Sequence, residues 1–294
     1  MKIIVGPASK ELGTRIAQLL GVESVSVFSK TFPDGESYVR LEGSVEGEEA
    51  VIVQTTSPPQ DVRIIQLALI ADTAKRNGAK KVTAVVPYLA YARQDKIFLQ
   101  GEAISIEVIA RMLKAAGIDS LITVNVHQEK VLEKFPFPAK NLSAIPLLAE
   151  HFKEKGLKEA FALAPDKGAV YIAEQAMKVL GGEYGYLEKH RDRYTGQVSV
   201  EKGEFNVKGK TVIIFDDIIS TGGTIVAAAK ILYELGVGKV YVACVHPLLV
   251  GDAEKRIREA GVEEIVGTDS VPSLVSKVSL APLIAKELKE FQSG

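Results

Sequence analysis

Cysteine is almost absent from this sequence, because Cys244 is the only one among its 294 residues. A single cysteine cannot form an intrachain disulfide, which excludes the disulfide-rich scaffolds of small secreted proteins. The scarcity fits a reducing compartment. Since Cys244 stands in the apolar stretch 240–245, we expect it to be a small buried side chain of the core.

Long hydrophobic runs are missing as well. No apolar stretch approaches the roughly 18 residues that a membrane-spanning helix needs, so we expect no membrane partner. At the N-terminus, Lys2 is followed by three apolar residues and then by Gly6 and Pro7. That run is too short for a signal peptide and is typical of a first strand. These features together predict a cytoplasmic protein.

The sequence also has no large excess of positive or negative charge. Lys plus Arg is 36 and Asp plus Glu is 37, which gives a formal net charge of -1. Such a chain has no general basic field to hold a nucleic acid, so no nucleic-acid partner is expected. Apolar residues make up 47%, as in ordinary globular proteins, and the length predicts about two domains.

Short runs rich in β-branched residues alternate along the chain with longer stretches of helical period. Several runs are almost entirely apolar, which is typical of strands covered on both faces in a parallel sheet. The helical stretches 61–77, 104–116 and 224–235 are each followed by glycine, a common helix stop. The alternation predicts an α/β fold with parallel sheets flanked by helices. The expected strands are 2–5, 24–28, 50–55, 81–86, 120–125, 159–163, 184–188, 197–200, 211–215, 240–245 and 264–266.

The two halves of the chain resemble each other coarsely in their order of helix, strand and polar loop. Prolines interrupt the pattern at 136–141, where a boundary is expected. We therefore predict a first domain over 1–142 and a second over 143–279. The last segment, 280–294, is expected to form a helix that packs back on the first domain.

The strongest local signal follows the apolar strand 212–215. Two carboxylates come next, Asp216 and Asp217, and a turn of small polar residues then leads into a helix. The turn offers backbone N–H groups, hydroxyls and a helix N-terminus, all of which suit a phosphate. The aspartates would repel that phosphate, so sugar hydroxyls or Mg²⁺ are their expected partners. The residues of the turn are Ser220, Thr221, Gly222, Gly223 and Thr224.

This turn is neither a Gly-x-x-x-x-Gly-Lys-Ser/Thr loop nor a Gly-x-Gly-x-x-Gly loop. The segment 216–224 instead resembles the phosphoribosyl-pyrophosphate loop of the type I phosphoribosyltransferase fold. That resemblance implies two tandem domains of this fold. It also implies that the segment binds the ribose 5-phosphate moiety.

Three other segments carry polar or aromatic residues next to expected strands. From local sequence alone, each has an ordinary structural reading as a turn, a surface ion-pair cluster or a structural histidine. Together with the loop they resemble the ribose-phosphate pyrophosphokinase family over nearly the whole chain, from residue 6 to about 247. The residues concerned are Phe32, Asp34, Gly35 and Glu36 in the first segment, Arg93, Gln94 and Asp95 in the second, and His127 in the third.

The resemblance implies that the first two segments bind ATP. The Phe32 ring could stack on adenine, and the Arg93 guanidinium could hold polyphosphate. His127 and Asp166 would be associated with Mg²⁺, the implied cofactor. Histidine is an unusual ligand for this hard cation, so the His127 contact would run through water or phosphate.

Lys189 and Arg191 stand one residue apart in a charged segment. By itself this segment is typical of a solvated charged turn. On an extended chain the two cations would face the same side, with His190 facing the other. The resemblance implies a catalytic Lys-x-Arg pair, in which Arg191 also contacts ribose 5-phosphate.

The implied reaction moves the diphosphoryl group of ATP to the C1 hydroxyl of ribose 5-phosphate, for nucleotide biosynthesis. The implied assembly is a homo-oligomer, at least a dimer, with the active site between the two domains. Two alternatives stay open: a phosphoribosyltransferase of nucleotide salvage, and a non-catalytic regulatory subunit. The loop 96–102 has one lysine where many relatives have a long basic loop, which leaves regulation and nucleotide preference open.

Overall fold

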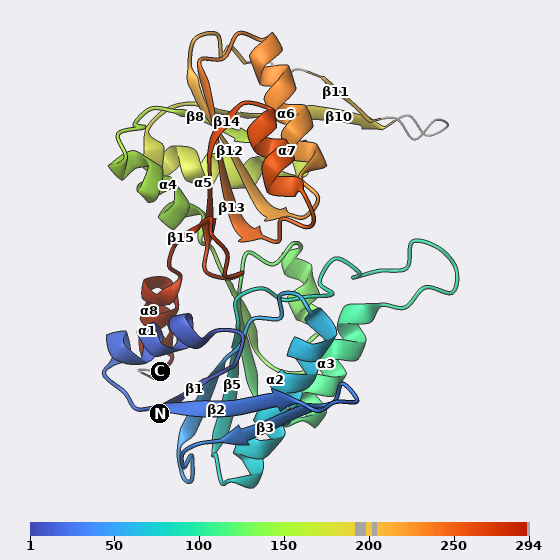
Figure 1. Cartoon of the computed structure of the whole chain (residues 1–294), viewed down its shortest axis with the longest axis vertical. Helices are drawn as coiled ribbons and strands as arrows, with labels where there is room; N and C mark the ends of the chain where they lie inside the picture. The colour runs from blue at the N-terminus through green and yellow to red at the C-terminus, as the bar shows by residue number, and fades with distance from the viewer. Residues whose placement is uncertain (192–197, 202–204, 293–294) are drawn as a thin grey trace. The chain divides into compact units, whose positions relative to one another are not determined.

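The computed structural model describes residues 1–191, 198–201 and 205–292, with the backbone alone for 188–191, 198–201 and 291–292. The chain forms two compact units (Figure 1). The first comprises Met1–Ser143, Ser270–Pro272 and Ser279–Gly294, and the second comprises Ala144–Asp269 and Ser273–Val278. Among the described residues, no helix is long and apolar enough to span a membrane.

The first unit is built on a seven-stranded sheet in the order β3-β2-β1-β4-β5-β6-β7. All neighbouring strands are parallel except β2 and β3, which form an antiparallel hairpin. Parallel strands end at the same edge of a sheet, so the segments that follow β1, β2, β4, β5 and β6 gather along one edge. The strands are β1 (Lys2–Val5), β2 (Ser24–Thr31), β3 (Ser37–Leu41), β4 (Glu49–Val53), β5 (Lys81–Val86), β6 (Ser120–Val124) and β7 (Ala139–Leu142).

Helices cover both faces of this sheet. Figure 1 shows α2 and α3 on one face and α1 with α8 on the other. Leu67 and Ile70 of α2 pack in a core cluster with Val82 and Ala84 of β5, while α8 packs against α1. The helices are α1 (Lys10–Leu20), α2 (Gln60–Arg76), α3 (Ser105–Ala115), the 3-10 helix η1 (Glu129–Lys134) and α8 (Ala281–Gln292).

The second unit has a six-stranded, all-parallel sheet in the order β15-β14-β13-β12-β8-β9, together with the separate hairpin β10-β11. Its strands are β8 (Phe161–Ala164), β9 (Tyr184–Tyr186), β10 (Glu188–Arg191), β11 (Val198–Glu201), β12 (Thr211–Ile219), β13 (Lys239–Pro247), β14 (Val262–Thr268) and β15 (Ser276–Val278). Its helices are α4 (Ile145–Glu154), η2 (Lys167–Ala169), α5 (Val170–Leu180), α6 (Gly223–Glu234) and α7 (Ala253–Glu259).

The predicted fold class, two α/β domains with mainly parallel sheets, is confirmed. Cys244 is fully buried, as expected. Four short strands, β3, β7, β10 and β15, were not predicted, and β7 occupies part of the proline-rich stretch where an interruption was expected. The predicted end of β12 at Phe215 was also wrong. The strand continues to Ile219, because residues 216, 218 and 219 stay paired with β13 and this pairing outweighs the weak strand preference of aspartate.

We expect His151 on α4 to make the stability of the second unit depend on pH. The ring is half-buried, and within the described part of the chain its Nε2 has no hydrogen-bond partner. Burial and the charge of Lys155 lower the pKa of His151, against the opposing charges of Glu264 and Glu154. The unfolded chain therefore binds this proton more readily, and stability should fall as pH drops through about 6.5, the unfolded value.

We expect His151→Gln to weaken that loss. Urea unfolding at pH 8 and pH 5.5 should show a smaller fall in the free energy of unfolding for the variant than for the wild type. Equal falls in the two proteins would show that His151 does not titrate on unfolding.

Candidate functional site

The loop that was expected to bind phosphate, residues 220–224, connects β12 to α6 in the second unit. Gly222 precedes the first residue of α6, has a left-handed backbone (φ 76°) and is buried, whereas Thr221 and Gly223 are exposed. The loop therefore presents backbone and hydroxyls at the N-terminus of a twelve-residue helix. This is the arrangement in which N–H groups and the helix dipole favour an anion.

Asp216 and Asp217 lie on β12 just before this loop. Asp216 Oδ1 accepts a hydrogen bond from the Asp217 amide at 2.9 Å, and Asp217 Oδ1 accepts one from the Ile218 amide at 2.7 Å. Burial raises the pKa of Asp216 well above its usual range, and the charges of Asp217 and Asp166 raise it further. These carboxylates oppose one another electrostatically, so a cation or a hydroxyl donor would be favoured beside them.

Asp166 belongs to the same edge of the second sheet. It follows β8, which is the parallel neighbour of β12, and its charge acts on Asp216. Its Oδ1 accepts from the amides of Gly168 at 2.8 Å and Ala169 at 3.2 Å, which fixes the side chain at the start of η2. The structure thus brings Asp166 close to Asp216 and Asp217, although Asp166 comes from a separate part of the sequence.

In the first unit, Phe32, Asp34, Gly35 and Glu36 form the turn between β2 and β3. The Phe32 amide donates to the Glu36 carbonyl at 2.8 Å, and Gly35 has φ 98°. Asp34 Oδ1 accepts from the Glu36 amide at 3.2 Å. The Phe32 ring is exposed and meets the edge of Tyr38 at 5.9 Å between centroids. The expected turn is present, and Lys30 Nζ lies over one face of the Phe32 ring, 4.6 Å from its centroid.

The segment with Arg93, Gln94 and Asp95 follows β5 at the same edge of the first sheet. Tyr91 has a left-handed backbone (φ 66°), its hydroxyl donates to Asp61 Oδ1, and its carbonyl accepts from the Gln94 amide at 3.1 Å. Arg93 is exposed and Gln94 and Asp95 are half-exposed. Tyr91 was not predicted to shape this loop, because a tyrosine with positive φ leaves no signal in the sequence.

His127 follows β6, again at this edge, and is half-buried. The chain before it is held by Asn141, whose Oδ1 accepts from the Val126 amide at 3.0 Å. Among the described residues, no group of three or more His, Cys, Asp or Glu side chains is arranged to hold a metal. His127 and Asp166 belong to different units.

Lys189 and Arg191 lie on β10, where they pair with Val200 and Val198 of β11. Their side chains fall outside the part of the chain that the structure describes. The backbone alone places both residues at alternate positions of one strand, with His190 between them.

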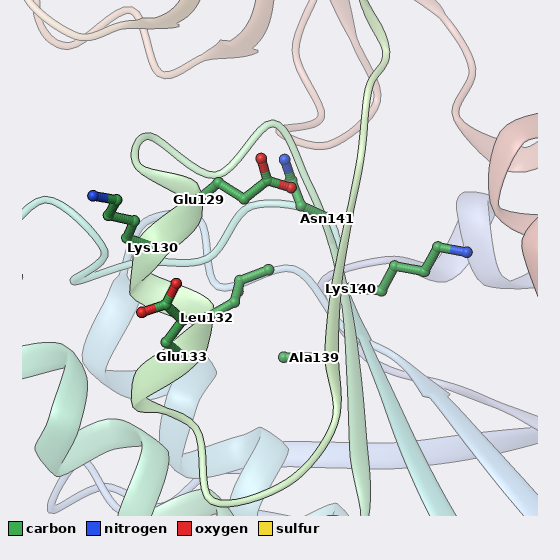
Figure 2. Close-up of a pocket in the computed structure, with 7 residues that line it drawn as sticks. All are labelled: Glu129, Lys130, Leu132, Glu133, Ala139, Lys140 and Asn141. Atoms are coloured by element: carbon green, nitrogen blue, oxygen red, sulfur yellow. The ribbon is translucent and has the colours of Figure 1, made fainter.

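A pocket of about 660 Å³ in the first unit was not expected from the sequence. It lies between η1 and β7, and Figure 2 shows the Glu129 carboxylate turned toward Asn141, with Lys140 turned away from η1. Lys140 Nζ pairs with Glu287 Oε1 of α8 at 2.6 Å. None of the predicted site residues lines this pocket. Its lining consists of Glu129, Lys130, Leu132, Glu133, Ala139, Lys140 and Asn141.

Comparison with known proteins assigns both halves of the chain. Residues 1–117 match the N-terminal domain of ribose phosphate pyrophosphokinase, and residues 138–275 match a phosphoribosyl transferase domain. The ribose-phosphate pyrophosphokinase of Saccharolobus solfataricus is 44% identical over 92% of this chain and 93% of its own. That of Methanothermobacter thermautotrophicus is 43% identical over 98% of this chain and 100% of its own.

A solved structure agrees with these relatives. The phosphoribosylpyrophosphate synthetase of Mycobacterium smegmatis superposes with a TM-score of 0.88 at 32% identity, covering 100% of this chain and 99% of that one. The similarity therefore extends over both units, and the chain belongs to the ribose-phosphate pyrophosphokinase family of enzymes.

Proposed function

We propose that this protein transfers the diphosphoryl group of ATP to the C1 hydroxyl of ribose 5-phosphate, giving 5-phosphoribosyl 1-pyrophosphate and AMP. The observation that carries the proposal is the β12–α6 loop, with a left-handed Gly222 and two carboxylates on the strand before it. Relatives that cover nearly the whole chain bear the name of this activity.

Ribose 5-phosphate is assigned to the second unit. The amides and hydroxyls of 220–224 bind its phosphate, which is the group that a helix N-terminus favours. Asp216 and Asp217 accept hydrogen bonds from the ribose hydroxyls, because hydroxyl donors stabilise carboxylates that are held close to one another. Arg191 of β10 supplies a further cation toward this substrate.

ATP is assigned to the first unit. The exposed Phe32 ring offers a stacking surface for adenine, while Asp34, Gly35 and Glu36 supply polar groups in the same turn. Arg93, Gln94 and Asp95 follow β5 at the edge where β2 also ends. The Arg93 guanidinium can hold phosphate oxygens with paired donors.

In the chemical step, the C1 hydroxyl oxygen bonds to the β-phosphorus of ATP, and the bond from that phosphorus to the oxygen shared with the α-phosphate breaks. AMP leaves with that oxygen, and the hydroxyl proton passes to solvent. The reacting charge stays on phosphate oxygens, so positioning and electrostatic stabilisation by Lys189, Arg191 and Arg93 supply the catalysis.

Mg²⁺ is the proposed cofactor. It is usually held in enzymes by one or two carboxylates together with substrate phosphates and water, and Asp166 fits this role because it is a half-buried carboxylate beside Asp216. His127 does not fit as a direct ligand, and we assign it to water or phosphate oxygens. When bound, the ion would neutralise phosphate charge.

The test of the reaction is to incubate the protein with ATP, Mg²⁺ and ribose 5-phosphate and to separate the nucleotides. The proposal expects AMP and 5-phosphoribosyl 1-pyrophosphate in equal amounts. ADP as the product would overturn it. So would consumption of 5-phosphoribosyl 1-pyrophosphate with a free base, or AMP formed only after a second subunit is added.

We also propose a homo-oligomer, at least a dimer, as the sequence resemblance implies. Size-exclusion chromatography with light scattering tests this, and a mass of one chain would contradict it.

Gly222→Ala should weaken binding of ribose 5-phosphate. A Cβ at this position would lie 2.9 Å from Ile257 Cδ1, and φ is +76°, so either the loop or the buried Ile257 side chain must shift. Gly236→Ala is the matched control, because it has the same φ at the other end of α6 but only Lys208 Cγ at 3.5 Å. We expect KM for ribose 5-phosphate to rise about tenfold or more in the first variant only, as for loss of one charged hydrogen bond. Equal KM values in the two variants would contradict this.

A further inference from the structure

The loop after β12 is held from one side by the segment that follows β13. The Leu249 amide donates to the Ile219 carbonyl at 3.0 Å, and the Val250 amide donates to the Ser220 carbonyl at 2.9 Å. Further along, Arg256 Nη2 of α7 donates to the Thr221 carbonyl at 2.5 Å. Three successive carbonyls, from 219 to 221, are therefore bound by one neighbouring segment.

Arg256 is itself fixed in place. Its Nε pairs with Asp252 Oδ1 at 2.9 Å, and its own amide donates to the Asp252 carbonyl at 3.0 Å. A guanidinium is planar, so donors held at Nε and Nη2 define the orientation of the whole group. Asp252 thus orients Arg256 toward the Thr221 carbonyl.

These contacts determine where the loop amides point. In a trans peptide the C=O and the following N–H project in opposite directions. Since the Ser220 carbonyl is turned to Val250 and the Thr221 carbonyl to Arg256, the amides of Thr221 and Gly222 are turned away from α7. Two consecutive amides on one side of a loop form the kind of concavity that binds anions.

Apolar packing closes the side of the loop next to α7. A Cβ added to Gly222 would lie 2.9 Å from Ile257 Cδ1 and 3.5 Å from Ala253 Cβ, and both of these residues are fully buried. The side of the loop next to α7 is therefore closed to a phosphate, and the amides of Thr221 and Gly222 are turned away from that side.

We infer that Arg256 is a positioning residue for ribose 5-phosphate, acting through the Thr221 carbonyl on the amides that bind the phosphate. The inference deepens the proposed function and rests on it. The positive guanidinium also polarises the 221–222 peptide, which makes the Gly222 amide a stronger donor. Arg256 itself makes no contact with the substrate in this role.

The test compares Arg256→Ala, Arg256→Lys and the control Arg258→Ala. Arg258 lies on the same helix but pairs with Glu254 at 2.9 Å, and it makes none of the three hydrogen bonds described above to the carbonyls of 219–221. Loss of a hydrogen bond from a charged donor should raise both KM and Kd for ribose 5-phosphate about tenfold in Arg256→Ala. KM for ATP and kcat should stay within about threefold of wild type. Lysine can still donate to the carbonyl, so Arg256→Lys should recover part of the affinity.

Three results would overturn the inference. The first is an Arg256→Ala variant whose KM and Kd for ribose 5-phosphate lie within about twofold of those of Arg258→Ala. The second is a lysine variant that binds no better than the alanine variant, and the third is an equal loss in kcat and both KM values, which marks general loss of structure. Kd is measured by calorimetry with ribose 5-phosphate alone, so failure of the reaction is distinguishable. If the wild-type protein forms no AMP, the proposed function is wrong, and the comparison of Kd values still decides the role of Arg256.

Discussion

Lys189→Ala is expected to lower kcat by about 100-fold to 1000-fold, the usual cost of removing one donor that stabilises transition-state charge. In the proposed reaction Lys189 faces phosphate oxygens whose charge is redistributed as the bond to the β-phosphorus forms. The loss should therefore fall mainly on kcat, with a smaller change in KM for ribose 5-phosphate. Steady-state assays of AMP formation measure both quantities.

His190→Ala provides the matched control for this experiment. Residue 190 pairs with Ser199 between the pairs formed by residues 189 and 191, so it belongs to the opposite face of β10. Truncation at 190 disturbs the same strand without removing a cation from the proposed site. A Lys189→Ala variant within tenfold of the wild type, or a His190→Ala variant that loses as much activity, would show that Lys189 is not catalytic.

The elements that were predicted best from sequence are those whose signal is local. Strands β1 and β5 have the predicted ends, because their apolar runs are bounded by charged or turn residues. The loop after β12 is also local: a strand, two acids, small polar residues and a helix follow one another within a few residues. Strand β3 was missed because its residues are mostly half-exposed and its pairing with β2 depends on the turn at 32–36.

What supports the loop could not be predicted from the sequence in the same way. Arg256 is 35 residues away from Thr221, and its partner is a backbone carbonyl, which has no side-chain signature. The left-handed backbone of Tyr91 is equally invisible, because tyrosine has no intrinsic preference for that conformation. Local chemistry indicates which residues meet a ligand, whereas the contacts that orient them depend on the folded sheet.

Asp216→Asn is expected to have opposite effects on stability and on activity. Burial and the charges of Asp217 and Asp166 raise the pKa of Asp216 well above its usual range. Below about pH 3.9 the carboxyl is protonated in both the folded and the unfolded state. As pH rises through the folded pKa, the unfolded chain releases this proton more readily, so the contribution to stability is lost. Asparagine cannot ionise, and the variant should melt at a higher temperature than the wild type at pH 7.

The same variant should be a poor enzyme. A carboxylate that accepts two ribose hydroxyls contributes about 3 kcal/mol to binding, since hydrogen bonds to a charged group are the strong ones. We expect kcat/KM for ribose 5-phosphate to fall about 100-fold. Gains in stability at the expense of activity are usual where like charges are held together for a ligand.

Asp119→Asn is the control of opposite sign for stability. Burial of Asp119 disfavours its ionised form, but hydrogen bonds from Lys75 Nζ at 2.7 Å and from the Val82 amide at 2.8 Å outweigh burial and lower its pKa. Removing that charge should lower the melting temperature at pH 7 without affecting activity, because Asp119 precedes β6, at the end of the strand opposite the edge with the proposed ATP residues. If Asp216→Asn were destabilising like Asp119→Asn, Asp216 would be a paired structural carboxylate. Higher stability together with lower activity in Asp216→Asn is expected only if the repulsion between the carboxylates of β12 is relieved when ribose binds to them.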